Sequence, residues 1–138
     1  GNLAPVGESF PEEGSTHVPV GTQVEYKTNP PTSGNHYADP ANWGVYEQQV
    51  DDRQLVHNLE HGGIWISYKD IDDDTKAKLQ DIGRKHPGSV VVEPRPQNDT
   101  KIAVVSWTRR LTLDTFDRDK IEEFITHNIN KSPEPLAR

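Results

Sequence analysis

The chain has 138 residues, the size of one ordinary domain, so a single core and a single site are expected. Its formal net charge of -7 argues against nucleic acid as a partner, because neutralising phosphates requires a concentrated basic face. Cysteine and methionine are both absent, which excludes thiolate and thioether ligands. Any bound metal ion must therefore be held by imidazole and carboxylate groups.

The N-terminal part of the chain is rich in residues that form turns and loops. Prolines and glycines recur among polar residues there, without the periodicity of a helix or a strand. We therefore expect residues 1–16 to form an extended arm or linker, which leans on a single globular domain spanning residues 17–138. Residues 23–26 are compatible with a short strand.

The second half of the chain has a more regular pattern of apolar residues, which predicts alternating helices and strands. The expected elements are two helical turns at 54–61, a buried strand at 64–68, a helix at 72–86, strands at 90–92 and 101–107, and a last helix capped by Asp117 that aligns Ile121, Phe124, Ile125 and Ile129 on one face. This order predicts an α+β fold: a small mixed β-sheet with two main helices packed on it and a long, loop-rich N-terminal part. Its topology is reminiscent of half of a thioredoxin-like fold.

The strongest local motif is the pair of histidines in the segment His57-Asn58-Leu59-Glu60-His61. Residues four apart on a helix lie one above the other, so the imidazoles of His57 and His61 can hold one ion. With Glu60 they form the string H-x-x-E-H, in which two histidines bind zinc and the glutamate polarises water in one class of peptidases. However, the peptidase motif belongs to a long helix, and Gly62-Gly63 end this helix at once. We therefore favour a binding site and keep a small zinc-dependent hydrolase, with Glu60 as its catalytic base, as the alternative.

Two further histidines lie in loops near turn-forming residues. His36 ends a loop whose path is fixed by Pro30-Pro31 and Gly34, and His17 precedes Val18-Pro19. A set of three or four imidazoles suits Cu(II) or Zn(II), and copper is slightly favoured because it binds most tightly in the Irving–Williams order. The predicted metal ligands are His36, His57 and His61, with His17 as a further candidate.

Each histidine also has a purely structural interpretation, as a helix cap or as a hydrogen-bonded core residue. We assign this role to His86 and His127. If all the histidines are structural, the protein is a metal-free binding module that presents aromatic residues to a partner in the cell envelope. That third hypothesis requires Tyr37, Trp43 and Tyr46 to form an exposed patch.

The chain also resembles the DUF3105 family, a domain of unknown function. The resemblance rests on PPTSGNHY at 30–37, Gly44-Val45-Tyr46 and LVHNLEHGG at 55–63, and more loosely on His17-Val18, the SWTRRL segment, Phe116-Asp117 and Pro133-Glu134. It implies that His17, His36, His57, Glu60 and His61 form one site, although it names no reaction.

The same resemblance implies where the protein works. Members of the family typically carry an N-terminal membrane anchor or export signal in bacteria and archaea, so an extracytoplasmic location is expected, periplasmic or at the cell surface. The chain itself contains no apolar run of about 18 residues, the length needed for a membrane-spanning helix. Membrane contact is therefore expected only through an anchor that precedes this chain. No protein partner can be named from the sequence.

Overall fold

The central strands of the sheet place alternate side chains on opposite faces. In the computed structural model, which describes residues 2–138, strand β5 (Ile64–Tyr68) directs Ile64, Ile66 and Tyr68 into one hydrophobic cluster and Trp65 into another. Strand β6 (Val90–Pro94) does the same, with Val90 and Val92 on the first side. Because successive residues of a strand point to opposite faces, these two short strands serve two separate cores.

One mixed six-stranded sheet organises the domain, in the order β1-β8-β7-β5-β6-β4. Strands β4, β6 and β5 are parallel, whereas β5, β7, β8 and β1 are joined by antiparallel pairs. The remaining bounds are β1 (Glu8–Ser9), β4 (Gly44–Val45), β7 (Ile102–Ser106) and β8 (Arg109–Leu113). Trp65 sits opposite Val91 on one neighbour and Val105 on the other, so it lies at the centre of the sheet.

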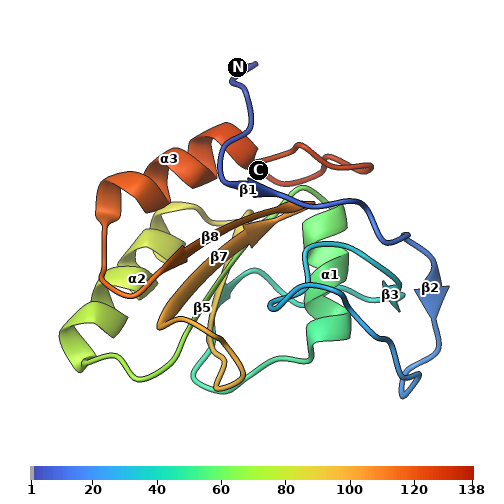
Figure 1. The fold of residues 1–138 in the computed structure, drawn as a ribbon, viewed down its shortest axis with the longest axis horizontal. Coiled ribbons are helices and arrows are strands. Elements are labelled where there is room, and N and C mark those ends of the chain that lie inside the picture. The colour runs from blue at the N-terminus through green and yellow to red at the C-terminus, as the bar shows by residue number, and fades with distance from the viewer. Residues whose placement is uncertain (1) are drawn as a thin grey trace.

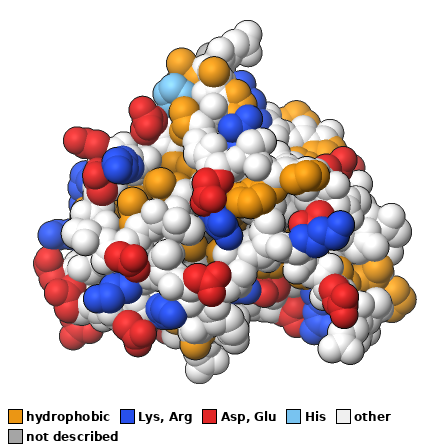
Figure 2. All heavy atoms as spheres, in the orientation of Figure 1, with side chains coloured by type: hydrophobic (Ala, Val, Ile, Leu, Met, Phe, Trp, Pro, Cys, Tyr) orange, Lys and Arg blue, Asp and Glu red, His pale blue; other side chains and the backbone are white. Residues whose placement is uncertain are grey.

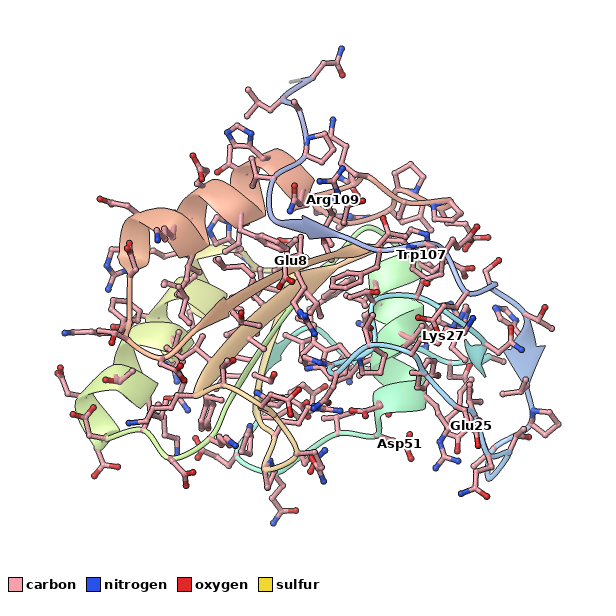
Figure 3. The ribbon with its side chains drawn as sticks, viewed as in Figure 1. Glu8, Glu25, Lys27, Asp51, Trp107 and Arg109 are labelled. Atoms are coloured by element: carbon pink, nitrogen blue, oxygen red, sulfur yellow. The ribbon has the colours of Figure 1, made fainter. Side chains whose placement is uncertain are left out.

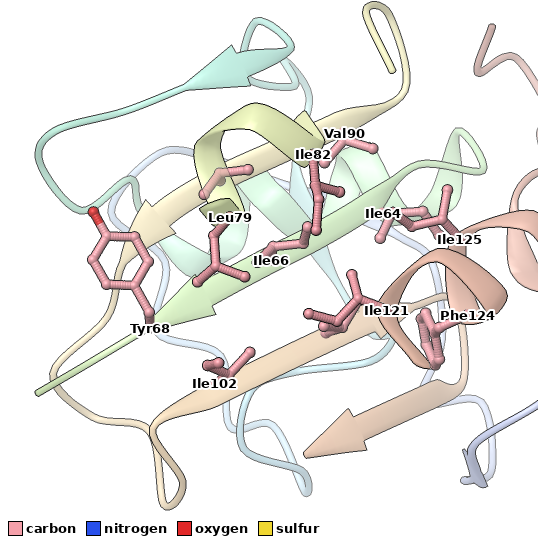
Figure 4. Close-up of a cluster of buried hydrophobic side chains, with 12 residues drawn as sticks. Ile64, Ile66, Tyr68, Leu79, Ile82, Val90, Ile102, Ile121, Phe124 and Ile125 are labelled. Carbon is pink, nitrogen blue, oxygen red and sulfur yellow. The ribbon is translucent and has the colours of Figure 1, made fainter. Parts of the chain in front are cut away.

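Helices α2 (Asp73–Lys85) and α3 (Arg118–Asn128) cover one face of this sheet. Figure 4 shows Leu79 and Ile82 of α2, with Ile121 and Phe124 of α3, against the aliphatic residues of the strands. Each helix begins at an aspartate whose side chain accepts a hydrogen bond from a backbone N–H of the first turn: Asp72 for α2 and Asp117 for α3. These two helices and the face of the sheet that they cover form the larger core.

Helix α1 (Asp52–Glu60) packs on the opposite face, on the right in Figure 1. Its residues Leu55, Val56 and Leu59 are fully buried and join Trp65 of the sheet in the second core. Burying an aliphatic side chain of this size stabilises a fold by about 1.5–3 kcal/mol, so these three residues anchor the helix firmly. Asp51 caps its start (Figure 3).

The N-terminal part adds two small pairings at the edge of the domain. β1 pairs with β8, so that Glu8 lies opposite Arg110 and Ser9 opposite Arg109; Glu8 and Arg109 are labelled in Figure 3. Farther along, β2 (His17–Val18) and β3 (His36–Tyr37) form a separate two-stranded parallel sheet. The segment before His17 thus contributes a strand to the main sheet.

The structure confirms the expected α+β class, with a mixed sheet and helices packed on it, but it does not confirm the thioredoxin-like likeness. The strand at 23–26 was wrong, because this stretch has no strand partner. Strand β8 was not predicted, because it begins with Arg109-Arg110 and only Leu111 and Leu113 show the apolar alternation of a strand. Ile129 is the C-cap of α3 and lies just outside the helix.

The surface and the helices bear on possible partners of the domain. Within residues 2–138, the helices are all too short or too polar to cross a membrane. On the face shown in Figure 2, acidic and basic side chains are interspersed, and no basic region stands out. That face offers no concentrated positive charge for phosphate groups.

Candidate metal centre

Helix α1 supplies two polar residues to a buried cluster. His57 and Glu60 are three residues apart and therefore lie on the same face of the helix, with only 3% and 5% of their surfaces exposed. Between them, the side chain of Asn58 accepts a hydrogen bond from the Ala41 N–H and donates one to the Ala41 carbonyl, both at 2.9 Å. The helix is thus fixed to the loop that precedes it.

The loop before β3 positions His36 in the same place. Thr32 and Ser33 are fully buried, and the Thr108 N–H donates to the Thr32 carbonyl at 2.8 Å. Gly34 has a φ of +123°, and a Cβ there would lie 2.8 Å from the ring of Tyr26, so only glycine fits. These contacts hold the loop in the path that its prolines and glycine predicted. The loop leaves His36 completely buried.

The short β2–β3 ladder brings His17 to the same site. His17 is the Cα partner of His36, and the His36 N–H donates to the Thr16 carbonyl at 3.0 Å. The Thr16 N–H in turn donates to the Asn35 side chain at 3.1 Å. His17 is the exposed member of the group, with 52% of its side chain accessible.

The four side chains converge. His17, His36, His57 and Glu60 each offer one ligand atom, and these atoms all lie within 4.8 Å of one another. The Nε2 atom of His36 is 3.1 Å from the Glu60 Oε1 atom, and that of His17 is 4.0 Å from it. The three imidazole centroids are 4.8 to 5.1 Å apart. Residues from three separate elements thus present their donor atoms to one point.

Hydrogen bonds on the far side of the rings decide which nitrogen faces that point. The Nδ1–H of His36 donates to the Gly34 carbonyl at 2.8 Å, and the Nδ1–H of His57 donates to the Tyr37 carbonyl at 2.7 Å. In a neutral imidazole, this leaves the lone pair on Nε2. A lone pair of His36 and a carboxylate oxygen of Glu60 then face each other at 3.1 Å, an arrangement that needs a proton or a metal ion between them.

Burial lowers the pKa of His57, and the neighbouring His61 and His36 lower it further, whereas the Tyr37 carbonyl acts in the opposite direction. Desolvation disfavours a charged imidazolium. The neutral form, which is the one that binds metal, is therefore favoured at this position.

His61 lies beside the cluster and belongs to a second group. It is the C-cap of α1, and its Nε2 atom is 2.9 Å from Nε2 of His57 and 3.3 Å from Oε2 of Glu134. Glu60, His61 and Glu134 form this second set of potential ligands. Of the predicted ligands, three gather with Glu60, while His61 joins Glu134. Sequence reasoning did not include Glu134 among the site residues. The one signal for it was the Pro133-Glu134 dipeptide, which is part of the family resemblance.

The other histidines and the aromatic residues lie in structural positions. His86 contacts Glu122 at 3.1 Å, and His127 donates to the Ala4 carbonyl at 2.8 Å. Tyr37 is buried, and Trp43 and Tyr46 are half-buried against the second core. The exposed aromatic patch required by the binding-module hypothesis is therefore not formed by these three residues.

Fold and site together define an α+β domain with a cluster of three histidines and one glutamate, in which His36, His57 and Glu60 are buried and His17 is exposed. The family model described as "Protein of unknown function (DUF3105)" matches residues 17–138, so the chain belongs to this family. No curated protein and no solved structure matches the chain.

Proposed function

We propose that the protein binds a divalent transition metal ion through His17, His36, His57 and Glu60, with Cu(II) favoured over Zn(II). One observation carries the proposal: the buried imidazoles of His36 and His57 both donate through Nδ1 to a backbone carbonyl, which leaves Nε2 free, and the ligand atoms of both rings lie within 4.8 Å of those of His17 and Glu60. Metal-binding histidines commonly make this hydrogen bond with their other nitrogen, which fixes the ring and its tautomer.

The distances suit a single ion after small adjustments. With ligand distances of about 2.1 Å, the donor atoms around a tetrahedral ion lie about 3.4 Å apart. The 3.1 Å and 4.0 Å contacts of Glu60 Oε1 bracket that value. Imidazole nitrogens and one carboxylate suit both Zn(II) and Cu(II), and the Irving–Williams order favours copper at equal availability.

Burial favours binding over catalysis. His36, His57 and Glu60 are buried, and His17 is the exposed ligand. An ion held in this way has few open positions for a substrate, and the exposed side chain of His17 marks the side from which the ion itself would enter. We therefore favour a role in metal binding or storage.

Metal analysis of the purified, reconstituted protein tests the proposal. We expect one equivalent bound tightly at the four-residue site, and strong loss of metal in His36→Ala and His57→Ala. The control is His127→Ala, which removes an imidazole on another element. A parent protein that holds well under one equivalent would refute the proposal, and a proton would then take the place of the ion between His36 and Glu60.

A zinc-dependent hydrolase is the second candidate, favoured by the position of Glu60 next to the imidazoles. As a general base, Glu60 would act on a metal-bound water; as a ligand, it would hold the ion. Glu60→Gln separates the two roles, because a catalytic base predicts retained metal with lost turnover. A ligand predicts weakened metal binding, which is the result we expect.

The proposal includes an extracytoplasmic location, which the family resemblance implies. Fractionation of cells that express the full-length gene product, followed by immunodetection, tests it. Detection only in the cytoplasmic fraction would exclude this part of the proposal.

A further inference from the structure

Glu60 is shared between the two groups of potential ligands. One group is the site described above, and the other consists of Glu60, His61 and Glu134. The side-chain contacts of Glu60 use its Oε1 atom, with His36 at 3.1 Å and His17 at 4.0 Å. Within residues 2–138 no hydrogen bond uses its Oε2 atom, and this atom is not one of the fully buried unpaired atoms, so it keeps some access to solvent. One carboxylate oxygen therefore remains for a further ligand.

The C-terminal tail (residues 130–138) holds Glu134 in place through its backbone. The Glu134 N–H donates to the Glu60 carbonyl at 3.1 Å, and the Ser132 hydroxyl donates to the same carbonyl at 2.6 Å. The N–H groups of Leu136 and Ala137 both donate to the His61 carbonyl. Carbonyls at the end of a helix lack partners within it, and the tail supplies them here. These bonds hold the backbone at Glu134, whose Oε2 atom lies 3.3 Å from Nε2 of His61.

The lone pair on His57 sets a further constraint. His57 has only Nε2 free, because Nδ1 donates to the Tyr37 carbonyl. If that lone pair binds an ion, it cannot also accept a proton from His61, whose Nε2 atom lies 2.9 Å away. His61 lies outside the first group, so an ion bound by its nitrogen and the Glu134 carboxylate would be a second ion, distinct from the first.

We propose that the site binds two divalent transition metal ions, with the Glu60 carboxylate bridging them. The first ion has the ligands His17, His36 and His57, and the second has His61 and Glu134. Carboxylate-bridged ions in two-metal sites lie about 3.5–4 Å apart. The inference rests on the proposed function, because the second ion depends on the bridging carboxylate of the first. The second ion is the more accessible, since the side chains of His61 and Glu134 are 22% and 55% exposed.

The test is metal stoichiometry of the full chain, measured with Zn(II) and with Cu(II) after reconstitution. We expect two equivalents in the parent protein and one in Glu134→Gln and in His61→Ala. The chain offers a matched control in His86 and Glu122, a second histidine–glutamate pair of similar distance, 3.1 Å, and similar histidine exposure, 27%. Glu122→Gln and His86→Ala should keep two equivalents.

Electron paramagnetic resonance of the Cu(II) protein adds an independent measure of distance. Two ions that share a carboxylate interact magnetically, so we expect a broadened signal and a half-field line in the parent. Glu134→Gln should show the spectrum of one isolated Cu(II). Its side chain is exposed and the backbone contacts of the tail remain, so this variant folds even where His61→Ala does not.

The outcomes are distinguishable. One equivalent in the parent, unchanged in Glu134→Gln, would overturn the second ion and leave the proposed function standing. Two equivalents that survive both Glu134→Gln and His61→Ala would place the second ion elsewhere and equally refute this assignment. Absence of bound metal in the parent would refute the proposed function and this inference together.

Discussion

Glu93 on β6 makes the stability of this domain depend on pH. The residue is fully buried in the sheet, where its carboxylate accepts hydrogen bonds from the Val50 N–H at 2.6 Å and from the Trp65 indole at 2.9 Å. Burial raises the pKa of Glu93 from its ordinary value of 4.5 to about 7, and these two donors and Arg95 offset only part of that effect. The folded protein therefore retains a proton that the unfolded chain releases.

The sign and size of the effect follow from linkage. Between pH 4.5 and about 7 the folded state binds more protons at Glu93 than the unfolded state, so the free energy of unfolding falls as pH rises through this window. Each unit between the two pKa values corresponds to about 1.36 kcal/mol, which gives a loss of about 3 kcal/mol by pH 8. Below pH 4.5 Glu93 is protonated in both states, so the loss is absent and the free energy of unfolding no longer changes with pH at this residue.

Denaturant unfolding of the parent and of Glu93→Gln from pH 4 to 8, with a chelator present, measures this contribution. The neutral variant should gain about 3 kcal/mol relative to the parent across this range, whatever its absolute stability. Exposed Glu123→Gln serves as the control for loss of a carboxylate. A difference between parent and Glu93→Gln that stays constant within about 1 kcal/mol would show that the Val50 and Trp65 donors hold Glu93 ionised, and would refute the argument.

Three further predictions concern the site and its supports. Zinc at about 100 times Kd should raise the unfolding free energy by about 2.7 kcal/mol and Tm by about 9 °C in a thermal melt, and His57→Ala should abolish the shift. Gly62→Ala should lower Tm far more than Gly21→Ala: both have a φ near +90°, but a Cβ at Gly62 meets the C-terminal tail at 2.3 Å, whereas Gly21 has nothing within 4 Å. Equal losses would show that backbone strain alone matters. Asn58→Ala leaves both polar groups of Ala41 without partners and should cost about 2–4 kcal/mol in denaturant unfolding; a loss below about 1 kcal/mol would contradict this.

Elements with strong local patterns were predicted well. Helix α2 and strand β5 both match the expected ranges within one residue at each end, and four of the five residues of β5 are apolar or aromatic. Strand β8 was missed because the turn before it uses Thr108 at a φ of +63°, where a glycine or asparagine would have marked a hairpin. The two-residue strands have no periodicity to detect, so only tertiary contacts define them.

For the site, local spacing indicated a site at His57 and His61 but not how it is divided. That His17 meets His36 depends on one ladder between loops, which is a contact between distant segments. The grouping of His61 with Glu134 depends in turn on how the tail docks on the end of α1. Neither relation leaves a trace in sequence spacing, so the sequence could not show that Glu60 belongs to both groups of potential ligands.

The glycines that end α1 give the H-x-x-E-H string a structural setting that differs from a long peptidase helix. A Cβ on Gly63 would lie 2.2 Å from the ring of Trp43, and a Cβ on Gly62 would lie 2.8 Å from the Cα of Asn130. Both positions must be glycine for the tail and the indole to approach the end of the helix. A longer helix, as in a peptidase, would occupy the space where the tail binds. The same two residues that argue against a peptidase helix thus let the tail bring Glu134 to His61, and the segment lies at the junction between two neighbouring groups of potential ligands.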